Sequence, residues 1–149
     1  MPLPELENLA RIGQLQPFPA SDREIATLLK SGRSRLADAR NVQLSLESRF
    51  DLAYNAAHAL ALAALRRAGY RSSNRFVVFQ VLPSTAGMPA ATWRVMAKAH
   101  DQRNLFEYEG GGEVDERLLS DLIAATQQLS AALGAGGGNR TPRAVSGER

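Results

Sequence analysis

Apolar residues recur at helical spacing along most of this chain. The first long run lies within residues 22–40 and contains, in order, Ile25, Leu28, Leu29, Leu36 and Ala39. Steps of three, four and seven residues place these side chains on one face, so we predict an amphipathic helix. Ser21, followed three residues later by Glu24, matches a capping box at the start of this helix. Gly32 is expected to weaken its middle.

Residues 46–68 predict the longest helix and the centre of the fold. The segment is rich in Ala and Leu, and its apolar groups occur nearly all round the helix, which favours packing on several sides. Gly69 follows where a helix C-terminus needs a left-handed residue. Tyr54, Asn55 and His58 are the polar exceptions. Because Tyr54 and His58 are four residues apart, they either form a satisfied internal network or project together into a cleft.

Shorter elements fill the gaps between the long helices. Residues 4–15 predict a short helix, which ends before residues 17–19, where two prolines preclude a regular ladder. Residues 71–75 predict a loop. The β-branched and aromatic residues of 76–82 also suit a short strand, but a lone strand has no partner, so we predict a short buried helix that ends before Pro83.

Two further helices and a tail complete the pattern. Pro89 is tolerated in a first turn and predicts a helix from there to about Tyr108, ended by the glycines at 110–112. Residues 115–133 predict a last amphipathic helix, with two acidic residues at its positive end. Residues 134–149 are Gly-rich and polar, and they predict a disordered tail.

The elements together predict an all-α protein, an antiparallel bundle of four to five main helices. We expect residues 1–20 to form an N-terminal extension with a short helix, residues 21–133 to form the helical domain, and residues 134–149 to form the tail. The chain of 149 residues is long enough for one domain with a real core.

Composition narrows the function classes. The chain has no cysteine, which excludes disulfides, thiolate nucleophiles and cysteine-based zinc sites. Its start lacks a signal-peptide pattern, and no apolar run approaches the roughly 18 residues that span a bilayer, so we expect a cytoplasmic protein with no membrane contact. With two histidines and no His-x3-His pair, we expect no metal site and no cofactor.

The charge is unevenly distributed along the chain. Residues 22–75 hold ten Arg or Lys against five Asp or Glu, whereas residues 76–133 hold four against seven. Such polarity suits an RNA backbone on one face and a protein partner or second subunit on the other. The alternative is a mixed solvated surface.

A cluster of polar residues near the end of the helix from Pro89 is the first candidate site. His100, Asn104 and Tyr108 are spaced by four and share one helical face, and Arg103 and Glu107 form a neighbouring pair. An arginine fork beside an amide and an imidazole or hydroxyl is a plausible phosphate-handling face. The structural alternative is a surface ion pair with Tyr108 as a half-buried end-cap. His58 and Tyr54 are candidates for a supporting network with Glu107.

Arginines near the end of the central helix are the second candidate site. They are Arg66, Arg67, Arg71 and Arg75. We predict that they contact an RNA backbone, although arginines at this end also suit the negative pole of the helix dipole. Trp93 is expected to anchor the core or a dimer interface, because most of its neighbours are apolar.

The motif at residues 103–108 resembles a known family. Arg103-Asn104-x3-Tyr108 follows a long helix with the patterns Phe50-x2-Ala53-Tyr54-x2-Ala57 and Ala64-Leu65-x2-Ala68-Gly69. The order and spacing resemble the HEPN superfamily, the small helical bundles named from higher eukaryotes and prokaryotes nucleotide-binding. That family's signature is an Arg, usually followed by a polar residue, and a His four to six positions later. The likeness covers roughly residues 22–133.

The resemblance implies a bundle that dimerises and places two motifs across a shared cleft. Many members are metal-independent RNases of toxin–antitoxin or defence systems, encoded beside a nucleotidyltransferase antitoxin. It implies that Arg103 holds the scissile phosphate. Tyr108 stands where the family has His, and with a reference pKa near 10 a tyrosine is a poor general base at neutral pH. His100, eight residues earlier, could act in its place; the alternative is that His100 is a polar residue packed at an interface.

We therefore expect a HEPN-like protein that binds RNA or a nucleotide at this cleft, with weak or absent metal-independent RNase activity. The alternative is a non-catalytic dimeric module that binds a protein partner such as a nucleotidyltransferase.

Overall fold

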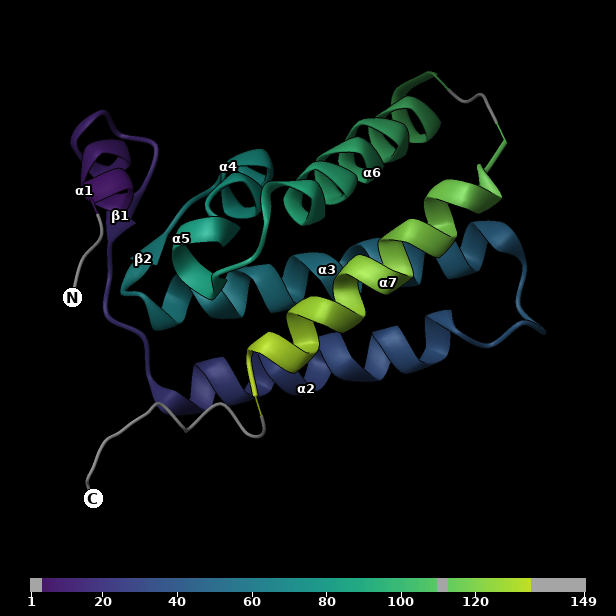
Figure 1. Cartoon of the computed structure of the whole chain (residues 1–149), viewed down its shortest axis with the longest axis horizontal. Coiled ribbons are helices and arrows are strands. Elements are labelled where there is room, and N and C mark those ends of the chain that lie inside the picture. The colour runs from purple at the N-terminus through teal and green to yellow at the C-terminus, as the bar shows by residue number, and fades with distance from the viewer. Residues whose placement is uncertain (1–3, 110–112, 135–149) are drawn as a thin grey trace.

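The computed structural model describes residues 4–109 and 113–134, with the backbone alone for residues 106–109. The predicted tail from residue 135 and the glycines at 110–112 lie outside the described residues. Within this part of the chain, seven helices and one pair of short strands form the fold (Figure 1). The helices are α1 (Pro4–Arg11), α2 (Asp22–Ala39), α3 (Leu46–Arg67), α4 (Arg75–Gln80), α5 (Leu82–Ala86), α6 (Ala90–Glu109) and α7 (Glu116–Ala132). The strands are β1 (Gln16–Pro17) and β2 (Tyr70–Arg71). The predicted all-α class is confirmed.

Helix α3 is the centre of the bundle. It packs against α2, α4, α5, α6 and α7. Figure 1 shows α2 and α3 side by side, with α7 lying over them and α6 on the other side of α3 from α2. Most of α3 is buried, and many of its buried residues are alanines, which let the neighbouring helices approach closely. The apolar residues all round this segment therefore correspond to a helix packed on several sides.

Helices α2 and α3 approach each other closely at Gly32 of α2. A Cβ atom at this position would lie 2.7 Å from Cγ of Leu60 and 3.3 Å from the carbonyl oxygen of Ala56, both on α3. Leu60 is fully buried, so it has little room to move. Gly32 is expected from propensity alone to weaken its helix, but here its missing side chain lets α2 and α3 pack tightly.

Local signals set the helix ends, and those at Ser21 and Gly69 are as predicted. The Ser21 hydroxyl accepts a hydrogen bond from the backbone N–H of Glu24 at 3.1 Å, which caps α2. Ser45 caps α3 in the same way, through the N–H of Ser48 at 3.1 Å. Gly69 follows α3 with a φ of +94°, the left-handed conformation expected of a residue that ends a helix.

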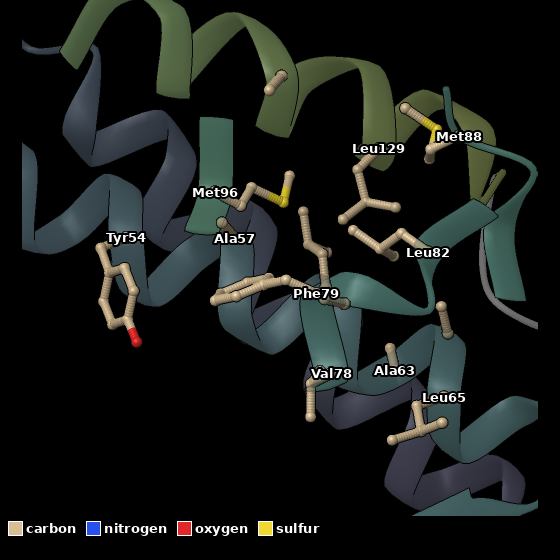
Figure 2. Close-up of a cluster of buried hydrophobic side chains, with 14 of the residues drawn as sticks. Tyr54, Ala57, Ala63, Leu65, Val78, Phe79, Leu82, Met88, Met96 and Leu129 are labelled. Atoms are coloured by element: carbon tan, nitrogen blue, oxygen red, sulfur yellow. The ribbon is translucent and has the colours of Figure 1, made fainter. Parts of the chain in front are cut away.

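The ambiguous segment at 76–82 is helical, as predicted. Asn74 caps α4 by accepting a hydrogen bond from the N–H of Val77 at 3.3 Å. Phe79 of α4 is fully buried, and in Figure 2 its ring lies beside Ala57 of α3 and Met96 of α6. Pro83 does not simply end this element; it stands in the first turn of α5, where its missing N–H needs no partner.

The N-terminal segment departs from the prediction. Helix α1 ends at Arg11, and Pro17 pairs with Tyr70 in a short antiparallel ladder, so the expectations of a helix to residue 15 and of no ladder at the prolines were wrong. The predicted loop at 71–75 likewise begins with a strand residue, Arg71. A proline fits this ladder because β1 pairs with β2 along one edge only, so the missing N–H of Pro17 can lie on the unpaired edge. The N–H of Phe18 continues the pairing by donating to the carbonyl of Gly69 at 2.8 Å.

The first twenty residues also contribute to the main core. Leu6 of α1 and Leu15 have exposed fractions of 2% and 1%, and both belong to the same buried cluster as α3. The Ser72 hydroxyl donates a hydrogen bond to the carbonyl of Gln14 at 2.9 Å, which ties this segment to the chain after α3. Among the described helices, none is long and apolar enough to cross a membrane.

Candidate functional site

Polar side chains of α3, α4 and α6 meet around the ring of Tyr54. They are Asp51, Tyr54 and His58 of α3, Arg75 of α4, and His100, Arg103 and Asn104 of α6. We call these seven residues the Tyr54 cluster. Sequence reasoning had placed five of them in one site, and the other two, Asp51 and Arg75, are brought there by the packing of α3 against α4 and α6.

The Tyr54 side chain links the apolar core to this polar cluster. Its residue is fully buried, and its ring lies 6.1 Å from that of Phe79 in an edge-on arrangement. Figure 2 shows the hydroxyl pointing away from the surrounding apolar side chains. There it lies 2.9 Å from Nδ1 of His100, which gives this hydroxyl a close hydrogen-bond partner.

His100 is held on both sides of its ring. Nδ1 faces the Tyr54 hydroxyl, and Nε2 lies 3.4 Å from Nδ2 of Asn104, one turn later on α6. The ring also stacks on that of Tyr54, with a centroid separation of 6.1 Å. The predicted pairing of His100 and Asn104 on one helical face is therefore observed, and it fixes the orientation of the imidazole.

Two arginines from different helices converge on Tyr54. The guanidinium carbon of Arg75 lies 5.8 Å from the ring centroid, and Nη1 donates to the hydroxyl at 3.4 Å. The guanidinium carbon of Arg103 lies 5.2 Å from the same centroid, so about 11 Å at most separates the two cations. Nε of Arg103 is 3.8 Å from Oδ1 of Asp51, longer than a charge-assisted hydrogen bond.

His58, partly buried in the cluster, is held neutral. Its ring packs edge-on against Phe79 at 6.0 Å. Burial, and after it the positive charges of Arg75, His100 and Arg103, together lower the pKa of His58 to about 4. His58 is therefore a neutral imidazole at physiological pH, in a region where the potential is positive.

The chemistry available to the cluster is that of anion binding. Arginine forks bind phosphate or carboxylate oxygens in a bidentate manner, and a neutral imidazole and an amide can orient the ligand. Among the described side chains, no group of three or more His, Asp or Glu could hold a metal ion. The predicted contributions of Tyr108 and Glu107 concern side chains outside the described residues.

Arg66 has a structural role, which corrects its assignment to an RNA-binding patch. Its residue is 4% exposed, and all five of its N–H groups donate hydrogen bonds. Two reach the carboxylate of Glu24, at 2.8 and 3.3 Å. The others reach the carbonyls of Phe18 at 2.7 Å, Tyr70 at 2.9 Å and Pro19 at 2.9 Å. Arg66 therefore clamps the β1–β2 region to α2 and α3 and is not accessible to a nucleic acid.

The remaining arginines of the predicted patch have different surroundings. Arg75 belongs to the Tyr54 cluster, whereas the guanidinium carbon of the exposed Arg71 lies 4.1 Å from the ring centroid of Phe18. Arg67 is partly buried. RNA contact by Arg67 and Arg71 stays a prediction. Comparisons of this chain with protein-family models, with curated proteins and with solved structures found no match.

Proposed function

We propose that the Tyr54 cluster binds the phosphate of RNA or of a nucleotide, and that the protein is HEPN-like, with weak or absent metal-independent RNase activity. The observation that carries this proposal is the convergence of Arg75 and Arg103, from two helices, on the Tyr54 ring beside His100. Arginines spaced in this way offer two forks to neighbouring phosphate oxygens.

Arg75 and Arg103 give the cluster the positive charge that an anion requires. Among the described side chains, Arg103 pairs with the carboxylate of Asp51. The separation of 3.8 Å between Arg103 and Asp51 makes this a weak pair, and the Asp51 side chain is 63% exposed, so solvent screens it. A phosphate that replaces this contact gains a stronger, charge-assisted one.

The geometry of His100 favours binding over cleavage. For His100 to act as the general base of metal-independent RNA cleavage, its imidazole needs a lone pair aimed at the 2′-hydroxyl. In this cluster both ring nitrogens of His100 face a polar side chain, Tyr54 on one side and Asn104 on the other. The imidazole must break one of these contacts before it can accept a proton from a substrate, which supports a low or absent rate of cleavage.

The resemblance to HEPN proteins extends the proposal to the cellular setting. It supports a homodimer, a role in a toxin–antitoxin or defence system, and a nucleotidyltransferase partner. Sedimentation velocity of the purified protein tests the first of these, and a mass at the monomer value over the whole accessible concentration range would rule out the dimer.

The site is tested by measuring the affinity for RNA from fluorescence anisotropy, in EDTA and at low salt. Arg75→Ala and Arg103→Ala are each expected to weaken binding about tenfold and to lower the slope of log K against log salt by about one. The control is Arg35→Ala, an exposed arginine on α2, which lies across α3 from α6 in Figure 1; its effect should stay within about twofold.

Gel analysis of the same samples measures cleavage. Intact RNA with Arg103-dependent binding is the expected result. If the affinity for RNA is unchanged when Arg75 and Arg103 are both substituted, the Tyr54 cluster is not the RNA-binding site. Circular dichroism melting of each variant shows that the fold is retained.

A further inference from the structure

An aromatic pair, partly exposed to solvent, lies next to the Tyr54 cluster and has no part in the phosphate site described above. Phe76 follows Arg75 directly on α4, and its ring is perpendicular to that of Trp93 on α6, with centroids 5.8 Å apart. Phe76 is 37% exposed, and Trp93 is half-buried against the core. Water therefore contacts a large apolar side chain that the fold holds in place beside an arginine.

Helix geometry aligns this pair with the cluster. Trp93 and His100 are seven residues apart on α6, so they share one face and lie about 10.5 Å apart along the helix axis. Asn104 continues the same face by one further turn. On α4, Arg75 reaches Tyr54 while its neighbour Phe76 contacts Trp93. Trp93 of the aromatic pair and His100 of the Tyr54 cluster thus lie on one strip of α6, about three base-stacking steps of 3.4 Å apart.

Two cations lie near the aromatic pair. Arg75 of the Tyr54 cluster directly precedes Phe76 on α4, and the guanidinium carbon of Arg94 is 5.9 Å from the ring centroid of Trp93. Exposed aromatic rings between arginines are the arrangement with which proteins bind single-stranded nucleic acid, because bases stack on the rings while the cations follow the backbone.

We infer that the RNA bound at the Tyr54 cluster is single-stranded, and that one of its bases stacks on the pair formed by Phe76 and Trp93. This inference rests on the proposed phosphate site and specifies its substrate class. A duplex cannot use the aromatic pair, because its bases are already stacked and paired and present only their backbone and edges. Duplex RNA therefore gains only the phosphate contacts of Arg75 and Arg103.

The single tryptophan of the chain makes the stacking directly observable. Titration with a short single-stranded RNA is expected to quench the emission of Trp93, and the same strand in a duplex should quench it far less. Phe76→Leu keeps an apolar side chain but removes the ring, and it should weaken single-strand binding by roughly 5- to 150-fold, the range for one lost stacking contact. Its effect on duplex binding should stay within about twofold.

Leu105→Ala is the matched control, because Leu105 is a similarly exposed apolar residue of α6, at 42%. It should leave the affinities for both RNAs unchanged within about twofold. Equal binding of single strand and duplex, dependent on Arg103 but unaffected by Phe76→Leu, would overturn the stacking inference and leave the phosphate site intact. Binding of neither RNA would overturn the proposed function itself.

A third outcome identifies a different occupant of the aromatic pair. Emission from Trp93 that changes with protein concentration in the absence of RNA, and no longer does so in Phe76→Leu, would show that a second copy of the chain covers the pair. That result also overturns the stacking inference.

Discussion

Arg66 shows how much of a residue's role is set by its burial. Its guanidinium joins one carboxylate and three backbone carbonyls, so Arg66→Lys keeps the charge but cannot reach all of these acceptors. We expect Arg66→Lys to lower the free energy of unfolding by about 3 kcal/mol, because buried acceptors lose their partners. Urea denaturation measures this change. Arg71→Lys, at an exposed site, is the control and should change stability by less than about 0.5 kcal/mol.

His58 predicts a pH dependence of stability. The pKa of His58 is lowered from its usual 6.5 to about 4 in the folded protein, so below pH 6.5 the unfolded chain binds a proton that the folded chain does not. The contribution of neutral His58 to the free energy of unfolding is therefore fully present above about pH 6.5 and is lost as the pH falls toward 4. When the pH is lowered from 7 to 4, the free energy of unfolding should fall by about 3 kcal/mol more in the unsubstituted protein than in the His58→Gln variant.

The pH series needs denaturant melts of both proteins at each pH, so that titration of every other group cancels in the difference. The NMR shift of the His58 ring proton gives the folded-state pKa independently. Parallel loss of stability in the two proteins, or a midpoint for His58 near 6.5, would contradict a buried, neutral imidazole.

At the scale of elements, the contact of α2 with α3 depends on Gly32. Gly32→Ala should gain about 1 kcal/mol from helix propensity, but its Cβ would overlap the buried Leu60 side chain. We expect a net loss of about 1–2 kcal/mol in the free energy of unfolding, measured by denaturant melts. Ala26→Gly at an exposed position of α2 measures the propensity term alone. Stabilisation by Gly32→Ala equal to that term would show that the helices have room at this point.

The helices themselves were largely predictable, because their signals are local. Helical spacing, the cap at Ser21 and the glycine after α3 act within a few residues of one another along the chain. The segment at 76–82 was harder, since its composition fits a strand as well as a helix, and the absence of a strand partner decided it. The pairing of β1 with β2 was missed because its two segments lie more than fifty residues apart and are only two residues long each.

At the scale of the whole molecule, the N-terminal segment forms part of the core. Leu15→Ala should lower the free energy of unfolding by about 2–5 kcal/mol, because Leu15 is 1% exposed within the main cluster. Ile12→Ala is the control, since Ile12 is 69% exposed and its truncation should have an effect of less than about 0.5 kcal/mol. Thermal melts followed by circular dichroism compare the two. Equal, small effects would show that residues 1–20 are a separable extension.

The candidate site also belongs to the whole molecule. The residue types were predictable, because Tyr54 and His58 interrupt an apolar helix and because His100, Arg103 and Asn104 lie within five residues. That these residues meet in one cluster was not predictable, because the hydrogen bond between Tyr54 and His100 joins positions 46 residues apart and depends on how α6 packs against α3. Asp51 carried no signal in the sequence that distinguished it from any other exposed carboxylate.

By itself the sequence determined the all-α class, the long helices and the central place of α3, since periodicity, caps and composition act locally. Only the tertiary structure decided which of the arginines are available. Arg66 and Arg75 are both arginines near one end of α3, but one is enclosed by carbonyls and a carboxylate while the other reaches the Tyr54 hydroxyl. The reason is physical: burial and charge pairing depend on which groups the packed helices bring within a few ångströms, and spacing along the chain does not specify them.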